Sequence, residues 1–373
     1  MNNKVLYFGN FNFKTGFSSI NRALGISKLF FDSFQMEALI FCKDYDGSLE
    51  GNSFLASNKI KIKENGTKTK LSARWYENTI VEEGSVKGVV LYDFPFALQC
   101  EIYKFCKRRK IFVISDITEW YDTKNTPVLL KLPKKIDVYL RMNFVHRHSS
   151  GLIAVSDYLY RQFLKKMGRS RLIKIYPTAD FFLFEKKEKR FAKKSHGSTT
   201  VFCYCGNSGR GKDRIGQLIQ TFDGMKARNA KLLIAGCLGA NAPHCQNNGA
   251  VEFCGNLNRK QLIELYQFAD YQFIVRKPTR ANSAGFPTKF VESLCFDVVP
   301  VFTSVSDLSL FKECGIMLDD CGRLNKKLIA SLANEKNKMD HKQTAVDCRF
   351  MADWYLPEFK KMVGEIINEK SYQ

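Results

Sequence analysis

The chain alternates short apolar runs with longer helical patterns, and it does so twice along its length. Apolar runs that predict strands lie at 5–8, 37–42, 88–92, 111–115, 151–155 and 172–175, and again at 200–205, 230–235, 250–253, 271–275 and 298–303. Helical patterns lie at 17–34, 96–109, 128–146, 158–167, 214–225, 259–268, 287–296, 323–334 and 351–368. Continuously apolar runs are typical of parallel strands buried on both faces. We therefore predict an α/β fold with two doubly wound parallel sheets.

The length of 373 residues agrees with two domains, or with one large one, at roughly 100–200 residues for a typical domain. A basic stretch, EKKEKRFAKK at 185–194, separates the two alternations. We predict a first domain over 1–180, a basic linker in loop conformation over 181–198, a second domain over 199–350, and a C-terminal helix over 351–373 that packs back on the first domain. Two facing domains of this Rossmann-like kind bind ligands in the cleft between them, at the carboxyl ends of their strands.

The chain is strongly basic, with 58 Lys and Arg against 37 Asp and Glu and a formal net charge of +21. This excess indicates an anionic partner, which could be a nucleic acid, a phosphorylated metabolite or an acidic membrane surface. The sequence begins without a signal-peptide pattern and contains no apolar run of about 18 residues. The twelve cysteines are scattered among core-like segments, so we expect reduced thiols and a cytoplasmic protein.

A glycine-rich loop, GNSGRGKD at 206–213, follows a predicted strand and opens a helical pattern. Glycines allow close approach of the backbone to a phosphate, and a helix N-terminus offers free N–H donors. Arg210 and Lys212 add full positive charges. The loop also matches the start of a nucleotide-binding P-loop, but Asp213 replaces the hydroxyl that would hold Mg²⁺. A tight turn with incidental basic residues would give the same pattern.

A second motif, RKPTRANSAGFPTKFVESLCFDVVP at 276–300, follows another buried strand. In the predicted helix, Lys289 and Glu292 are three residues apart and share one face. A lysine near a helix start suits a phosphate, and a carboxylate one turn later suits two adjacent sugar hydroxyls. This pairing indicates a nucleotide-sugar site, although an ordinary ion pair on a helix would have the same spacing.

Three segments, YCGNSGRGKDRIGQLIQTF, VEFCGNLNRKQLIELYQFADYQFIV and SAGFPTKFVESLCFDVVPVF, resemble the donor domain of retaining GT4-type glycosyltransferases with the GT-B fold. AVS at 154–156 and YPTAD at 176–180 resemble the acceptor domain more weakly. The resemblance implies two Rossmann-like domains and transfer of a sugar from a nucleotide-sugar donor, with no metal and no further cofactor. It implies that the acceptor is a glycan or is linked to a polyprenyl diphosphate, in assembly of surface polysaccharide or glycolipid.

The resemblance also implies roles for individual residues. Lys212 would neutralise the donor diphosphate and Glu292 would bind the ribose hydroxyls. The donor-binding set comprises Gly16, Gly206, Asn207, Arg210, Lys212, Ser283, Gly285, Phe286, Thr288, Lys289 and Glu292. The chain departs from the family at Ala284, where a sugar-contacting Glu is common, and at Asn207, where an Arg is common. Some bacterial members with a P-[ST]-K-x-x-E helix also lack the first Glu.

Polar and aromatic residues in the first half are candidates for acceptor binding. Lys14 lies in the loop after the first strand, and Glu119, Trp120 and Tyr121 follow the strand at 111–115. Aromatic rings stack on sugars and carboxylates accept hydroxyl bonds, so this set suits a glycan. Asp116 best matches the family's position near the reacting centre, and we expect it to act there by charge or positioning. A capping aspartate and a packed tryptophan are the structural alternative.

Basic residues are dense in the first half, and the pattern at 128–146 mixes leucines with lysines. Such a basic amphipathic helix suits an anionic membrane surface at the cytoplasmic side, or else forms an ordinary solvated face. No cluster of His and Cys has zinc-ligand spacing, so we predict no metal. Two other functions would also use the charge or the glycine loop: nucleic-acid binding, for which no module is recognisable, and P-loop nucleotide hydrolysis, which Asp213 disfavours.

Overall fold

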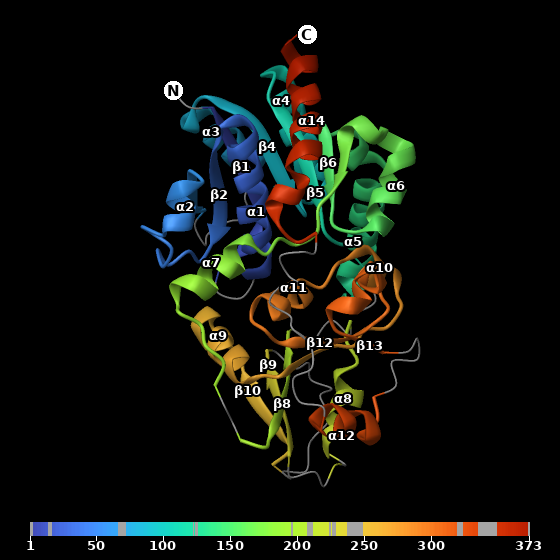
Figure 1. The fold of residues 1–373 in the computed structure, drawn as a ribbon. Helices are drawn as coiled ribbons and strands as arrows, with labels where there is room; N and C mark the ends of the chain where they lie inside the picture. The colour runs from blue at the N-terminus through green and yellow to red at the C-terminus, as the bar shows by residue number, and fades with distance from the viewer. Residues whose placement is uncertain are drawn as a thin grey trace. The chain divides into compact units, whose positions relative to one another are not determined.

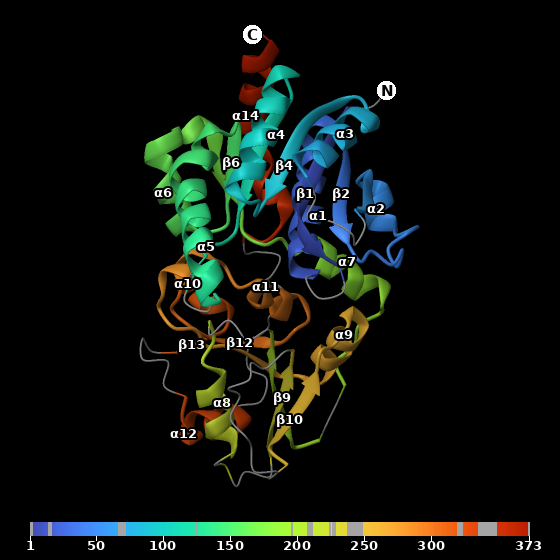
Figure 2. The same cartoon turned by 180° about the vertical axis from the view of Figure 1, so that it is seen from behind.

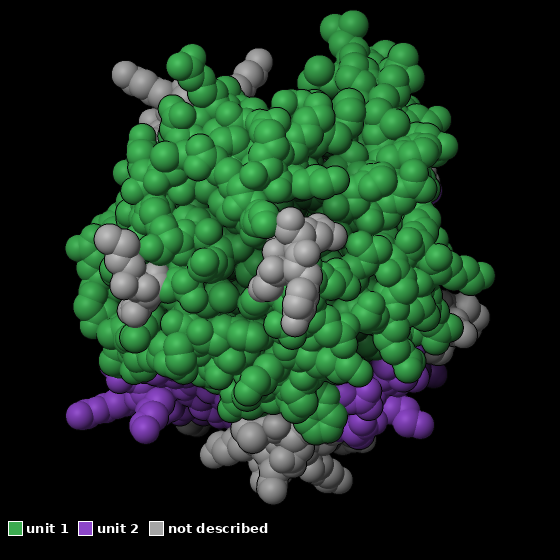
Figure 3. Space-filling view, turned by 90° about the horizontal axis from the view of Figure 1, so that it is seen from above, with its two compact units in different colours: residues 1–181, 351–373 green, residues 182–350 purple. Residues whose placement is uncertain are grey.

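The computed structural model describes residues 3–13, 17–65, 72–121, 123, 126–194, 197–206, 212–223, 225, 229–236, 249–318, 324–334 and 349–371. The chain divides into two compact units, which Figure 3 distinguishes by colour. Unit 1 comprises Met1–Phe181 with Met351–Gln373, and unit 2 comprises Phe182–Phe350. Each unit is built on its own sheet, and in both sheets the paired strands are parallel.

Unit 1 is a seven-stranded sheet in the order β3-β2-β1-β4-β5-β6-β7. Its strands are β1 (Lys4–Asn12), β2 (Glu37–Lys43), β3 (Ile60–Glu64), β4 (Val86–Tyr92), β5 (Phe112–Ile117), β6 (Gly151–Ala154) and β7 (Leu172–Lys174). Its helices are α1 (Phe17–Phe34), α2 (Ser53–Ser57), α3 (Ala73–Glu83), α4 (Phe96–Arg108), α5 (Val128–Leu140), α6 (Asp157–Met167) and α14 (Ala352–Ser371), with short turns η1 (Arg141–Val145), η2 (His146–His148) and η3 (Arg169–Arg171). Helices α1 and α14 cover one face and α3 and α4 the other (Figures 1 and 2).

Unit 2 is a six-stranded sheet in the order β10-β9-β8-β11-β12-β13. Its strands are β8 (Thr200–Cys205), β9 (Ala230–Ala235), β10 (Val251–Gly255), β11 (Tyr271–Ile274), β12 (Val299–Thr303) and β13 (Ile316–Leu318). Its helical elements are α8 (Ile215–Asp223), α9 (Arg259–Phe268), α10 (Arg280–Ala284), α11 (Thr288–Cys295), η5 (Leu308–Cys314) and α12 (Lys326–Asn334), and most of α7 (Asp180–Glu188). Phe202, Phe222 and Phe273 pack ring against ring in its core.

The predicted α/β class with two doubly wound parallel sheets is confirmed. The central strand β1 shows why continuous apolar runs predicted strands correctly. Its residues Val5, Leu6, Tyr7 and Phe8 are all fully buried. Strand β3 was missed because it lies at an edge of the sheet and reads IKIKE, of which only Ile60 is buried. Burying one face of an edge strand requires few apolar residues, so its pattern is weak.

The segment 181–198 differs from the predicted loop. Its first part belongs to helix α7, and the division between the two units falls inside this helix, after Phe181. Glu185 in α7 is buried and pairs with Lys189 one turn later, at 2.8 Å. The loop prediction is therefore wrong for 181–188, where a buried carboxylate and an i,i+4 pair stabilise a helix, whereas 189–194 form a largely exposed turn and loop as expected.

Two further helices bear on the sequence predictions. The single helix expected over 128–146 ends at Leu140 and continues as the π-helical turn η1 and the 3₁₀ turn η2. The C-terminal helix α14 belongs to unit 1 and packs against α1, where Phe359 meets Phe30 edge to face.

None of the described helices is long and apolar enough to cross a membrane. The described cysteines carry free thiols.

Candidate functional site

In unit 2 the strand order reverses between β8 and β11, which are hydrogen-bonded neighbours. The connections that leave the carboxyl ends of two such strands run in opposite directions, and the space between them is the usual ligand site of a doubly wound sheet. Here the chain leaves β8 at Gly206 and leaves β11 at Arg276. Both predicted donor motifs therefore start at this one point of the sheet.

Asp213 organises the charged groups at this point. Its carboxylate lies 2.8 Å from Lys289 Nζ and 3.0 Å from Arg276 Nε, and it accepts a 2.7 Å hydrogen bond from the hydroxyl of Tyr204. Burial by itself would raise the pKa of Asp213, but Lys289 and Arg276 hold it well below its usual value. The Lys289 ammonium also lies over the Tyr204 ring, 4.2 Å from its centroid.

The contacts of Asp213 explain how an acidic residue can lie in this basic loop. One carboxylate lies between two cations, Lys289 and Arg276, so the net charge of these three groups is positive. Lys289 also faces the glycine loop, because a Cβ placed on Gly206 would lie 3.5 Å from its Nζ. A cationic group beside a backbone without a side chain suits a diphosphate. Asp213, Arg276 and Tyr204 were not among the predicted site residues, and only their convergence in space identifies them.

Glu292 and Lys289, three residues apart on α11, do not pair with each other. Glu292 is 9% exposed and pairs with Arg259 of α9, while the hydroxyl of Tyr266 donates to its other oxygen at 3.3 Å. Arg259 also binds Glu185 of α7, through Nε at 2.8 Å. A single guanidinium thus holds two carboxylates, and it fixes the direction in which Glu292 points.

The surroundings of Arg259 raise the pKa of its guanidinium. Its guanidinium lies over the ring of Phe182, 4.7 Å from the centroid. Burial would lower its pKa, but Glu292 and Glu185 together raise it. Sequence reasoning missed Arg259, although it directly follows Asn258, whose side chain forms a capping box with Gln261 at the start of α9.

Side-chain hydrogen bonds from Asn282 hold the segment before α11 in place. The Asn282 side chain donates to the backbone carbonyls of Lys212 at 3.0 Å and Lys277 at 2.8 Å, so it ties the two donor motifs together. The predicted residues Ser283 and Thr288 are half-buried and Gly285 is buried. Phe286 is predicted to face the transferred sugar, but its ring is buried against neighbouring aromatics (Phe290, Phe311 and Phe350). Lys14, Gly16, Asn207 and Arg210 lie outside the described residues.

In unit 1, Asp116 lies inside β5 rather than after the strand as expected. It is 1% exposed and binds Arg22 of α1, whose Nη2 lies 2.7 Å away, and it accepts a hydrogen bond from Tyr7 of β1. Arg22 also donates to the carbonyl of Ile175 at 2.9 Å. This buried pair joins β1, β5 and α1, so the observed contacts of Asp116 are structural ones. A part in the reaction stays a prediction.

The predicted acceptor residues surround an aspartate that sequence reasoning missed. Asp93 directly follows β4 with φ +52° and accepts hydrogen bonds from Tyr121 at 2.8 Å and Thr118 at 3.2 Å. Burial, opposed by Arg141, raises the pKa of Asp93 to about 6. Trp120 packs edge to face on Tyr158. Glu119 and Trp120 are half-buried, and together with Asp93 they form a polar cluster at the carboxyl ends of β4 and β5.

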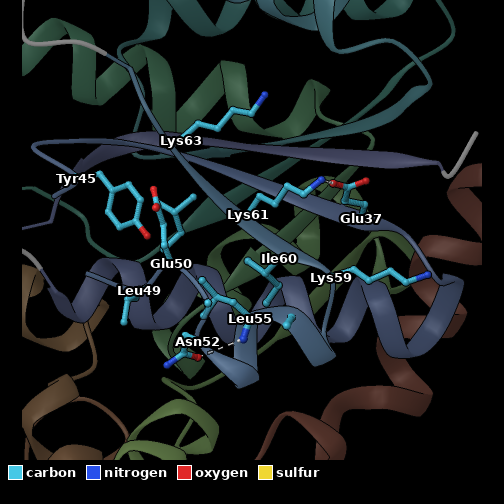
Figure 4. Close-up of a pocket in the computed structure, with 13 residues that line it drawn as sticks. Glu37, Tyr45, Leu49, Glu50, Asn52, Leu55, Lys59, Ile60, Lys61 and Lys63 are labelled. Atoms are coloured by element: carbon cyan, nitrogen blue, oxygen red, sulfur yellow. Dashed lines mark hydrogen bonds and ion pairs between the residues drawn. The ribbon is translucent and has the colours of Figure 1, made fainter. Parts of the chain in front are cut away.

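A hollow of about 580 Å³ lies elsewhere in unit 1, along β3 and α2 (Figure 4). Lys61 points across it to Glu37 at 2.5 Å, and Asn52 caps α2 by accepting from Phe54 N–H at 3.0 Å. None of the predicted site residues that the structure describes lines this hollow. The described residues also contain no group of three His, Cys, Asp or Glu that could hold a metal ion.

Known proteins resemble this chain in structure but not in sequence. No model of a known protein family matches the sequence, and no curated protein matches it either. A glycosyltransferase from Rickettsia africae ESF-5 superposes with a TM-score of 0.60 at 15% identity, over 99% of both chains. Anabaena HepE in complex with UDP and glucose gives 0.60 at 12% identity, over 98% of this chain and 99% of that one.

The lipopolysaccharide outer core galactosyltransferase WaaB also matches, with a TM-score of 0.58 at 14% identity over 97% of this chain and 99% of its own. The three matched proteins span this chain almost end to end. The two parallel sheets are therefore those of the GT-B fold of these glycosyltransferases.

Proposed function

We propose that the chain is a glycosyltransferase that moves a sugar from a nucleotide-sugar donor to a hydroxyl group of an acceptor. The observation that carries the proposal is the pair of cations, Lys289 and Arg276, around Asp213, at the point where the unit 2 sheet reverses its order. A donor diphosphate carries negative charge at the place where these cations converge. The matched glycosyltransferases support the assignment, and HepE was determined with UDP and with UDP-glucose.

The cluster has a clear part in the reaction. Transfer breaks the bond between the anomeric carbon and the diphosphate oxygen, and the nucleoside diphosphate leaves with the electron pair. Negative charge therefore grows on the leaving group in the transition state. Cations that the fold already holds in place stabilise that charge without reorganising. We assign this part to Lys212 and Lys289, with Asp213 and Tyr204 positioning Lys289.

Glu292 is proposed to bind the ribose hydroxyls of the nucleotide. A carboxylate can accept hydrogen bonds from two adjacent hydroxyls while it keeps its contacts with Arg259 and Tyr266. These two residues are positioning residues, because they fix the rotamer of Glu292. UDP is the first nucleotide to test, by analogy with HepE.

The acceptor is proposed to be a glycan or a polyprenyl-diphosphate-linked sugar, used in assembly of a surface polysaccharide or glycolipid in the cytoplasm. The polar cluster of Asp93, Glu119, Trp120 and Tyr121 supports this, since it combines hydroxyl acceptors with an aromatic ring. We assign retention of anomeric configuration, after the GT4-type resemblance. No covalent role is assigned to Asp116, because Arg22 and Tyr7 already occupy its carboxylate.

A panel of UDP-, GDP-, ADP- and CMP-sugars tests the proposal by thermal stabilisation, since a ligand that binds only the folded state raises its Tm. One member of the panel should raise the Tm of the wild-type protein. Lys289→Met and Glu292→Gln should each weaken that ligand at least tenfold, whereas Lys326→Met, on the exposed side of α12, should leave it unchanged. Release of nucleoside diphosphate in the presence of acceptor then tests transfer. Equal ligand affinity in all three variants would contradict the site.

A further inference from the structure

Helix α5 exposes apolar side chains that a surface helix would ordinarily bury. Leu129 is 91% exposed and Val128 is 87% exposed, and Leu130, Leu132 and Ile136 are exposed as well. In the described part of the chain, seven of the thirteen large apolar side chains that are exposed belong to residues 128–144. Scattered single apolar residues are normal on a surface, but a contiguous group marks an interaction site.

The helical geometry places most of these apolar side chains on one side of α5. At about 100° per residue, Val128, Leu129, Leu132, Ile136 and Tyr139 fall within one sector of about 100°. In an ordinary surface helix that sector would face the core. In α5 all five of these side chains are exposed, and the buried residue of the helix is Val138. The apolar stripe is thus turned toward the solvent.

The charges on this segment are almost all positive. Lys131, Lys134 and Lys135 fall in the sector beside the apolar stripe, and all three are exposed. The segment's one acidic residue, Asp137, accepts a 2.7 Å hydrogen bond from the N–H of Phe96 at the start of α4. That carboxylate is committed to capping a helix of the same unit, so the exposed surface is cationic.

The surface continues beyond α5. In η1, Phe144 is 41% exposed and lies under Arg147, 5.1 Å from the guanidinium to the ring centroid. Lys166 of α6 donates to the carbonyl of Met142 at 3.3 Å, so α6 lies beside this turn (Figure 2). A hollow of about 500 Å³ also runs along the helix, lined among others by Leu130, Pro133 and Lys134.

We propose that this surface, residues 128–147, docks the protein on an anionic lipid membrane. An exposed apolar stripe flanked by lysines is the arrangement of helices that lie in the plane of a membrane interface, with the stripe in the acyl boundary and the lysines at the headgroups. A protein partner would not require the exposed charges beside the apolar stripe to be all positive, whereas anionic headgroups attract every one of these lysines. The inference goes beyond the proposed transfer reaction and stands on exposure and charge alone.

Co-sedimentation of the full-length protein with vesicles tests it. Vesicles of equimolar phosphatidylcholine and phosphatidylglycerol should bind the protein, and pure phosphatidylcholine vesicles should bind it at least tenfold more weakly. Leu129→Ser/Leu132→Ser/Ile136→Ser should lower the partition coefficient at least tenfold. Lys131→Ser/Lys134→Ser/Lys135→Ser should lower it about fivefold for each lysine lost, and should flatten its salt dependence.

The matched control is Val81→Ser/Leu310→Ser/Trp354→Ser, which removes three other exposed apolar side chains and should leave vesicle binding unchanged. Failure of the wild-type protein to bind anionic vesicles would overturn the inference, and so would equal binding by the α5 and control variants. If the wild-type protein is a dimer that the α5 serine variant dissociates, the surface serves a second copy instead. Nucleotide-sugar stabilisation is measured in the same samples, so loss of donor binding and loss of vesicle binding are separate results.

Discussion

The ammonium of Lys289 lies 2.8 Å from the carboxylate of Asp213, although the two residues are 76 positions apart. Asp213 lies in the loop after β8, and Lys289 lies in the first turn of α11. The side chains are 7% and 10% exposed, so the pair is largely desolvated. The carboxylate that follows Lys212 in the glycine-rich loop is the group that holds Lys289 in position.

Replacing Asp213 with Asn should destabilise unit 2, because Lys289 and Arg276 would lose their shared counter-charge in a buried place. Removing one partner of such a cluster costs about 3 kcal/mol of unfolding free energy. Calorimetry at neutral pH measures the fall in Tm. Glu264→Gln, an exposed carboxylate on α9, is the control and should change it little. An unchanged Tm for Asp213→Asn would contradict the role of the cluster.

The stabilisation that Asp213 provides should depend on pH in the acid range. The pKa of Asp213 is lower in the folded protein than its ordinary value of 3.8, so its contribution is fully present above that value and is lost as the pH falls below it. The difference in Tm between wild type and Asp213→Asn should therefore shrink below pH 4. A difference that is constant down to the acid transition would argue against the ion pair.

Arg259→Met should leave Glu292 and Glu185 without their common partner, and it should lower the unfolding free energy by about 3 kcal/mol. Arg259→Lys should recover only part of this, because an ammonium cannot bridge two carboxylates as a planar guanidinium does. Urea denaturation measures both. The neighbouring exposed Lys260, changed to Met, provides the control.

Asp93→Asn should stabilise the protein at neutral pH. The pKa of Asp93 is raised to about 6, so the folded state retains a proton that the unfolded state has lost between about pH 4 and 6. Ionisation above pH 6 therefore costs stability, up to about 3 kcal/mol, which the neutral Asn avoids. The gain in Tm should be largest above pH 6 and disappear below pH 4. Glu101→Gln, on the exposed face of α4, should show no such trend.

A double-mutant cycle on Arg22→Met and Asp116→Asn should give a coupling free energy well above 1 kcal/mol, since each partner is buried and the other is left uncompensated. The exposed pair Lys104 and Glu101, 3.0 Å apart, is the reference cycle. Its coupling should stay below about 1 kcal/mol, because solvent screens it. Equal coupling in the two cycles would contradict a structural role for Asp116.

Much of the fold could be predicted from the sequence because the signals are local. Buried parallel strands need apolar side chains on both faces, so β1 and β5 can be recognised as continuous apolar runs in the sequence. The edge strand β3 buries little, and helix α7 is rich in charge, so neither pattern reveals its element. The two predicted donor motifs were identified in the same way, because a loop that follows a strand is a local feature.

What the site consists of was decided by the tertiary structure. The sequence by itself determined two doubly wound sheets and the motifs that begin with Gly206 and Arg276. Only the folded chain brings Asp213 to Lys289, Arg259 to Glu292, and Tyr121 to Asp93, because ion pairs and hydrogen bonds act over a few ångströms and depend on distance in space. For α5, the sequence indicates a basic amphipathic helix, and the folded chain adds which of its apolar side chains remain exposed.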